Sequence, residues 1–161
     1  MKRIVTSAMS VMVMFGLMVS AAFAATSGAH FFSATSAINP NGSLSVKFDE
    51  AGLGQSTVRY SLAYSYSATF ACINGGGNHP KAANKETKTG TGTVAAAFTP
   101  KNGRVQATIT TAAPSPGSFA CPAGQTLVLA NVSYSGIRLT DLTNSVSTAV
   151  ASVSRMFVDI R

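Results

Sequence analysis

The sequence predicts an all-β fold: an antiparallel, immunoglobulin-like β-sandwich of about seven to nine strands. Apolar and polar side chains alternate along several segments, which is the pattern of half-buried strands. Asn-Gly pairs and Pro/Gly-rich stretches separate these segments and indicate turns. Leu and Glu are scarce, and few apolar residues are spaced three or four apart as in a helix. Short strands joined by turns favour a sandwich or a barrel.

Residues 1–24 carry the three parts of a secretory signal peptide in the usual order. A basic start at residues 2–3 precedes an apolar stretch at 11–19, and an Ala-Phe-Ala cleavage pattern ends at Ala24. A membrane anchor is the alternative, but the apolar stretch is shorter than the roughly 20 residues that a spanning helix needs. We therefore expect cleavage near Ala24 and a single domain at 25–161. We expect this domain to be secreted, extracellular or periplasmic, and to have no transmembrane segment.

The first half of the domain contains the clearest strands. A strand near residues 30–38 is followed by the turn Asn-Pro-Asn-Gly at 39–42 and by alternation over 44–48. The run at 58–72 alternates without a break and would span about 50 Å, longer than most strands. We expect a bend there, or two strands in one phase. Its even positions carry tyrosines, which are expected in the core with their hydroxyl groups at the sheet edge: Tyr60, Tyr64 and Tyr66.

The second half continues the pattern. Four threonines at alternate positions are expected to line one solvated face: Thr87, Thr89, Thr91 and Thr93. The remaining predicted elements are strands at 94–98 and 105–109 around a turn at 100–103, a Pro/Gly-rich connection at 113–125, a central strand at 126–134, a strand at 137–142, a turn at 143–145 and one or two strands within 146–160.

Cys72 and Cys121 are the two cysteines of the chain. Export delivers them to an oxidising compartment, so an even count favours a disulfide bond. Because the enclosed loop is long, the chain-entropy model gives about 4 kcal/mol of stabilisation. The alternative is a reactive thiol with a histidine partner, but the nearer histidine, His79, lies seven positions further on.

The stretch Ala-Cys-Ile-Asn-Gly-Gly-Gly-Asn-His-Pro-Lys that begins at residue 71 is the most unusual in the chain. Glycines permit positive φ, and a loop of this length is uncommon without a purpose. One purpose is structural, with the disulfide fastening two loops at one end of the sandwich. The other is a binding surface for a polar or anionic ligand, formed by His79, Lys81, Asn84 and Lys85.

The expected partner follows from the charge of the exported part. Without residues 2–3, ten basic and five acidic side chains remain, a net charge of +5. Such a charge suits an anionic or glycan surface. The basic residues are scattered, however, and no basic run alternates with aromatic residues, so nucleic acid is not expected as a partner.

No catalytic residue, metal ligand set or cofactor motif is identified. Asp49 and Glu50 are adjacent, so on a strand they point to opposite faces and cannot form an acid–base pair. The two cysteines and two distant histidines lack zinc-ligand spacing. Enzyme activity is left open, with a non-enzyme favoured. There is no Trp, and the tyrosines are expected in the core, which weighs against a sugar-stacking surface.

Three stretches carry a resemblance to known proteins: Glu-Ala-Gly-Leu-Gly at 50–54, the glycine-rich stretch at 71–86, and the segment at 117–141 that contains Ser-Phe-Ala-Cys-Pro-Ala-Gly-Gln. They resemble a group of small secreted bacterial proteins with no assigned activity. The resemblance implies export, one disulfide and a β-rich domain. The expected function is therefore a secreted, non-catalytic role in extracellular binding, adhesion or structure. The alternatives are a small secreted hydrolase acting on an extracellular polymer, and a secreted inhibitor or toxin.

Overall fold

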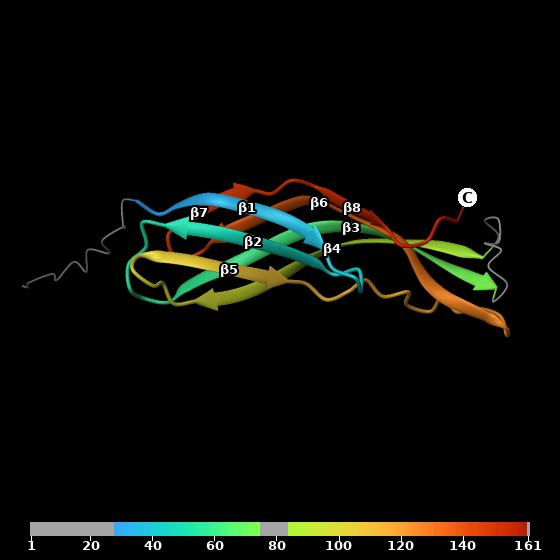
Figure 1. Ribbon diagram of the computed structural model, residues 1–161. Helices are drawn as coiled ribbons and strands as arrows, with labels where there is room; N and C mark the ends of the chain where they lie inside the picture. Colours follow the sequence, from blue (N-terminus) through green and yellow to red (C-terminus); the bar gives the residue numbers. More distant parts are fainter. Residues whose placement is uncertain (1–27, 75–83, 161) are drawn as a thin grey trace, which may run out of the picture.

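A computed structural model describes residues 28–74 and 84–160 of the chain, and in this part the protein is an all-β sandwich (Figure 1). The predicted fold class and strand number are confirmed, whereas the immunoglobulin-like connectivity stays a prediction. The described strands are β1 (His30–Ile38), β2 (Leu44–Ala51), β3 (Val58–Asn74), β4 (Lys85–Phe98), β5 (Arg104–Thr110), β6 (Gln125–Asp141), β7 (Val146–Ala149) and β8 (Val153–Met156).

Two antiparallel sheets form the layers of an elongated body (Figure 1). The smaller sheet has three strands in the order β1-β2-β5. The larger sheet has five strands in the order β4-β3-β6-β7, with β8 pairing with β6 beyond β7. β1 and β2, and β3 and β4, are antiparallel pairs of strands that are consecutive in the chain.

The core lies between the sheets and consists of the apolar members of the alternating runs. In β2 the buried members are Leu44, Val46 and Phe48, while Lys47 between them is exposed. The ring of Phe48 meets the ring of Tyr60 across the layers, with 4.8 Å between centroids. Full burial of one such side chain stabilises the fold by roughly 1.5–3 kcal/mol, so the alternation itself accounts for the packing of the two layers.

The two longest strands compare differently with the expectation. For residues 58–72 the expected outcomes were a bend or two strands, and the structure has one continuous strand, β3, with a register shift against β6 between Ala63 and Ser65. The segments at 126–134 and 137–142, expected as two strands, join in the single strand β6. Gly136 has a φ of 58° and pairing with β3 resumes beyond it, so an irregularity inside the strand replaces the expected break.

Glycine residues of β4 lie beneath tyrosine rings of β3. Tyr64 is opposite Gly92 and Tyr66 is opposite Gly90 in the register. A Cβ atom built on Gly92 would lie 2.5 Å from the Cζ atom of Tyr64, so only glycine fits there without movement of the ring. On the other face of β4 the predicted row of threonines is exposed, as expected: Thr87, Thr89, Thr91 and Thr93.

Candidate functional site

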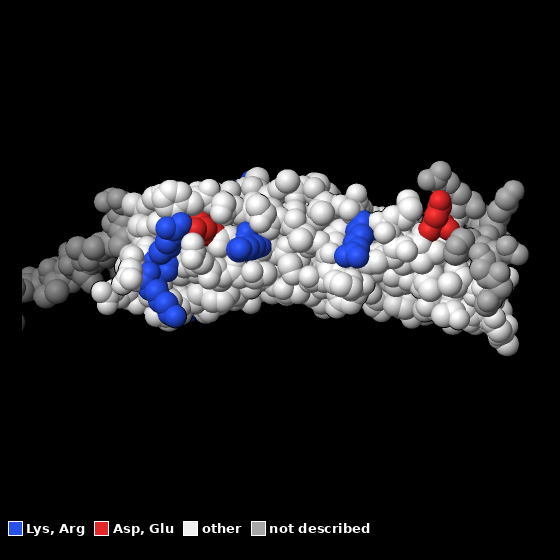
Figure 2. Space-filling view, viewed as in Figure 1, with Lys and Arg blue, Asp and Glu red and all other residues white. Residues whose placement is uncertain are grey.

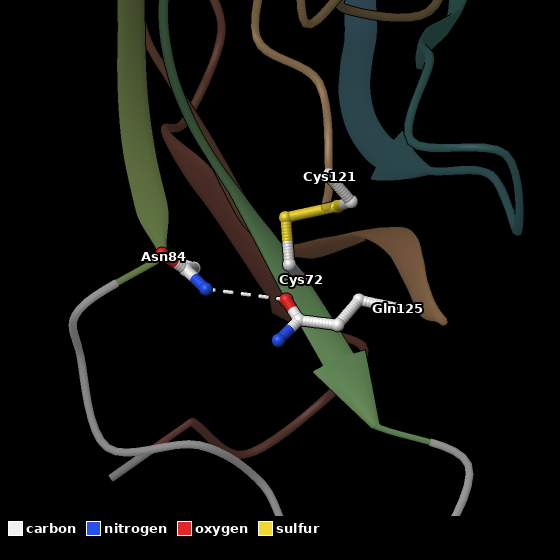
Figure 3. The surroundings of a disulfide bond; sticks show 4 residues. All are labelled: Cys72, Asn84, Cys121 and Gln125. Carbon is white, nitrogen blue, oxygen red and sulfur yellow. Dashed lines mark hydrogen bonds between the residues drawn. A yellow bond between two sulfur atoms is a disulfide. The ribbon is translucent and has the colours of Figure 1, made fainter. Parts of the chain in front are cut away.

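The predicted disulfide between Cys72 and Cys121 is present, with 5.5 Å between the Cα atoms (Figure 3). It joins the end of β3 to the connection between β5 and β6, across a sequence separation of 49 residues. No free cysteine occurs in the described residues. The bond therefore fastens the long connection to strand β3 of the larger sheet, whereas the expectation was a link between two loops.

The four predicted binding residues are placed only in part. His79 and Lys81 lie outside the described residues. The side-chain amide of Asn84 donates to Oε1 of Gln125 at 3.2 Å (Figure 3). The backbone carbonyl oxygen of Asn84 accepts from the backbone N–H of Cys72 at 3.0 Å. Asn84 thus links the ends of β3, β4 and β6. Lys85 is exposed at the start of β4, so its role as a binding residue stays a prediction.

A second group of polar side chains, which the sequence analysis did not identify as a site, lies on the outer face of the smaller sheet. We call it the outer patch and define it as Phe32, Lys47, Asp49, Arg104 and Gln106. The residues come from β1, β2 and β5, which are neighbours in the sheet. Asp49 is opposite Gln106, and Ala51 is opposite Arg104. Residues two positions apart in a strand point to the same face, so the side chains of Asp49, Arg104 and Gln106 share one face.

Phe32 is exposed because β1 contains a bulge. Phe31 pairs with Glu50 and Ser33 pairs with Asp49, which leaves Phe32 as an extra residue between two consecutive partners. Its side chain is 62% exposed, while Phe31 packs against the core. The Arg104 guanidinium carbon lies 5.2 Å from the centre of the Phe32 ring, and the His30 ring lies 4.7 Å from it. The ring is therefore flanked by polar groups but is still open to solvent.

The polar part of the outer patch is organised by Asp49. Arg104 donates from Nε to Oδ1 at 2.6 Å and from Nη2 to Oδ2 at 2.5 Å, and Gln106 donates to Oδ2 at 2.8 Å. The hydrogen bonds from Arg104, followed by that from Gln106, lower the pKa of Asp49 to about 2. Because a guanidinium carries five N–H donors, Arg104 retains further donors for a ligand.

The surface of the outer patch is shallow. A depression of about 370 Å³ lies beside the ion pair and is lined by Ser33, Thr35, Lys47, Phe48, Asp49 and Gln106. Figure 2 views this face of the molecule and shows acidic and basic side chains together toward one end of it, on a surface that is otherwise mostly uncharged. The patch offers one apolar ring, one fixed carboxylate and several N–H donors to a ligand lying along the sheet.

A third group of chemically active side chains lies inside the sandwich. The carboxyl cluster consists of Glu50 on β2, Tyr60 on β3 and Asp141 on β6, all of them completely buried. The Tyr60 hydroxyl donates to Oε2 of Glu50 at 2.7 Å. The expectation that this hydroxyl reaches the sheet edge is therefore wrong for Tyr60. It fails because a buried acceptor is available across the layers.

Burial is the main reason why the pKa of Glu50 is raised to about 7, and the nearby Asp141 raises it further. The Oε1 atom of Glu50 is buried and has no hydrogen-bond partner among the described residues. Asp141 instead accepts from the N–H groups of Thr143 and Asn144, at 2.7 and 2.9 Å. A protonated Glu50 and an accepting Asp141 form the arrangement that these contacts favour.

Both overlooked groups left a signal in the sequence. Consecutive residues of a strand point to opposite faces, so the Phe31-Phe32 pair already implies one outward ring. Glu50 is in the same alternation phase as the buried Phe48, and Asp141 in the same phase as the buried Leu139. The expectation that Asp49 and Glu50 face opposite sides is confirmed, since one belongs to the outer patch and the other to the carboxyl cluster.

Comparisons with protein-family models, with curated proteins and with solved structures found no match to the chain. Within residues 28–74 and 84–160 there is no helix that is long and apolar enough to cross a membrane. In the same residues, His, Cys, Asp and Glu do not gather in groups of three that could hold a metal ion.

Proposed function

We propose that this protein is a non-catalytic binding protein of the cell exterior, and that it binds the saccharide chains of an extracellular polymer through the outer patch. The observation that carries the proposal is the exposed Phe32 ring beside the fixed Asp49–Arg104 pair. An apolar ring can cover the C–H face of a sugar, while a few fixed polar groups bind its hydroxyl groups and set its orientation. The neighbouring Gln106 adds a further polar side chain.

The placement of the carboxylates favours binding over hydrolysis. Glycosidases generally use two carboxyl groups that flank the scissile bond and contact the substrate. Here Glu50 and Asp141 are completely buried and cannot contact a polymer. Asp49 is accessible, but its pKa of about 2 makes it a poor general acid or base near neutral pH. The hydrolase alternative is thus weaker than a binding role.

Export is part of the proposal. The signal-peptide pattern ending at Ala24 and the Cys72–Cys121 disulfide both favour an oxidising compartment outside the cytoplasm. The secreted bacterial group that the sequence resembles is consistent with the same location. A secreted inhibitor or toxin would use the same compartment, and the binding experiment below separates these roles, because only the proposed function requires a saccharide.

The test is retention of the purified, disulfide-bonded protein on insoluble chitin, cellulose and peptidoglycan, followed by a soluble-oligosaccharide array. We expect wild-type binding to at least one of these and its loss in Phe32→Ala. Leu142→Ala is the matched control, because Leu142 is 57% exposed but lies outside the patch. Asp49→Asn should weaken binding while preserving the side-chain shape. A thermal melt confirms that each variant is folded.

Two results would overturn the proposal. One is the absence of wild-type binding to every polymer and oligosaccharide. The other is equal binding by the Phe32→Ala and Leu142→Ala variants. Lys85→Ala provides a further arm: if this variant alone loses binding, the saccharide site lies at the disulfide end, as the glycine-rich stretch predicted, and not at the outer patch.

A further inference from the structure

We propose that two copies of this protein associate through the free edge of β4, with the strands antiparallel over Thr89–Ala97, so that the two larger sheets become one. β4 is the terminal strand in the order β4-β3-β6-β7, and in the described residues it pairs with β3 alone. No strand among the described residues pairs with its other edge, which presents N–H and C=O groups along a strand of 14 residues.

The other terminal strands carry features that discourage such pairing. β1 contains the bulge at Phe32, β5 has only seven residues and starts with Arg104, and β7 and β8 have four residues each. Short edge strands, bulges and charged side chains are the devices by which proteins prevent sheet-to-sheet association. The Thr89–Ala97 segment of β4 lacks these devices, because it contains no charged residue and no proline.

The side chains of this segment also permit close approach. Its outward positions hold threonine and alanine, and its inward positions include Gly90 and Gly92. The segment contains no long side chain that could obstruct a second strand at this edge. The charged residues of β4, Lys85, Glu86 and Lys88, all lie at the opposite end of the strand.

The occupant is a second copy because the uncharged segment is self-complementary. A two-fold axis at Thr93 places Thr93 opposite itself, Thr91 opposite Ala95, and Gly92 opposite Val94. An isologous contact of this kind closes as a dimer. Lys88 then lies opposite Phe98, whereas a parallel in-register arrangement would place each Lys88 beside its copy and cause repulsion.

A contact of the expected type already exists inside the molecule. Thr69 of β3 and Thr87 of β4 are opposite each other, and their hydroxyl oxygens lie 3.0 Å apart. Threonine opposite threonine is therefore compatible with this face of the sheet, and the same pairing at Thr93 would continue it across the two-fold axis.

The test is the oligomeric state of the purified, disulfide-bonded protein by sedimentation velocity over a wide concentration range. We expect a concentration-dependent dimer for the wild type and a monomer for Thr93→Lys, in which two lysines would face each other. Ser135→Lys is the matched control, because Ser135 is exposed on the same outer face but belongs to the interior strand β6. This control should dimerise as the wild type does.

Mixing the Thr93→Lys and Thr93→Glu variants should restore a dimer, since opposite charges then face each other. If Thr93→Lys does not fold, a mixture of Thr91→Glu and Ala95→Lys chains tests the same register. A wild type that is monomeric at every concentration overturns the proposal, as does an equal loss of dimer in Thr93→Lys and Ser135→Lys. The outer patch lies on the other sheet, so this result is independent of saccharide binding.

Discussion

Glu50 carries a carboxyl group in a part of the core from which water is excluded. Its carboxyl group is completely buried between the sheets, accepts from the Tyr60 hydroxyl and lies near Asp141. A second ionised carboxylate beside Asp141 would repel it in a region of low dielectric constant. The protonated form of Glu50 is therefore favoured below about pH 7.

The first prediction concerns the pH dependence of stability. The pKa of Glu50 is about 7 in the folded chain and about 4.5 in the unfolded chain, so the folded state holds this proton more tightly. The contribution of Glu50 to the free energy of unfolding is fully present below pH 4.5 and is lost as pH rises through 7. We expect the free energy of unfolding in urea to fall by roughly 3 kcal/mol across that window, and the dependence to flatten in Glu50→Gln.

Asp49→Asn is the control for this experiment. The lowered pKa of Asp49 contributes stability that is lost only as pH falls from about 4 toward 2, outside the window for Glu50. The Asp49 variant should therefore keep the wild-type slope between pH 4.5 and 7. A Glu50→Gln variant with that same slope would contradict the assignment of the proton to Glu50.

In the pair of strands β3 and β4, large side chains of one strand lie opposite glycines of the other. The rings of Tyr64 and Tyr66 occupy the space above Gly92 and Gly90, and the Tyr64 ring also meets the Tyr134 ring with 5.7 Å between centroids. A glycine in a strand ordinarily weakens it, but here the ring of the neighbouring strand covers the exposed backbone. The pairing of small with large residues supports a single register for this long hairpin.

The second prediction tests this pairing with Gly92→Ala. The added Cβ would lie 2.5 Å from the Tyr64 ring, so the ring must move and its contact with the Tyr134 ring is disturbed. We expect a loss of about 1–3 kcal/mol in the free energy of unfolding, measured by urea denaturation. Thr91→Ala, at the adjacent exposed position, should change it far less.

A double variant separates a steric effect from a loss of strand flexibility. Combining Gly92→Ala with Tyr64→Ala removes the ring that the new methyl group would meet. The cost of Gly92→Ala should then shrink, because the two positions are in direct contact and their effects are not additive. Strictly additive costs would show that Tyr64 is not the reason for glycine at position 92.

The whole molecule is an elongated pair of sheets, and the end of β3, which carries Cys72, lies toward the opposite end from the start of β5, which carries Arg104 of the outer patch (Figure 1). The connection from β5 to β6 crosses from the smaller sheet to the larger, and Cys121 anchors it to β3. A cross-link between segments so distant in sequence acts mainly by restricting the unfolded chain. It therefore bears on global stability more than on the geometry of any one site.

The third prediction follows for the variant with both Cys72→Ser and Cys121→Ser. For the 49-residue separation, the chain-entropy model gives a loss of about 4 kcal/mol in the free energy of unfolding. Wild-type protein treated with a reductant should show a similar loss in urea denaturation, which serves as the control. Unchanged stability in both samples would mean that the connection is held by packing alone.

The local sequence determined where most of the strands lie, most of their inward and outward faces and the identity of the disulfide partners. Alternation is a property of neighbouring residues, which is why the buried positions of β2 and β3 and the exposed threonines of β4 follow from the sequence. A pair of cysteines in an oxidising compartment has one possible connection, and the structure contains it.

Only the tertiary structure decided which strands are neighbours and which distant residues meet. Glu50 approaches Asp141 because two sheets pack face to face, and Phe32 turns outward because the pairing of β1 with β2 contains a bulge. The continuity of β6 past Gly136 likewise depends on its pairing with β3. Side-chain periodicity acts over a few residues, whereas register and layer packing are set by the free energy of contacts between segments far apart in the chain.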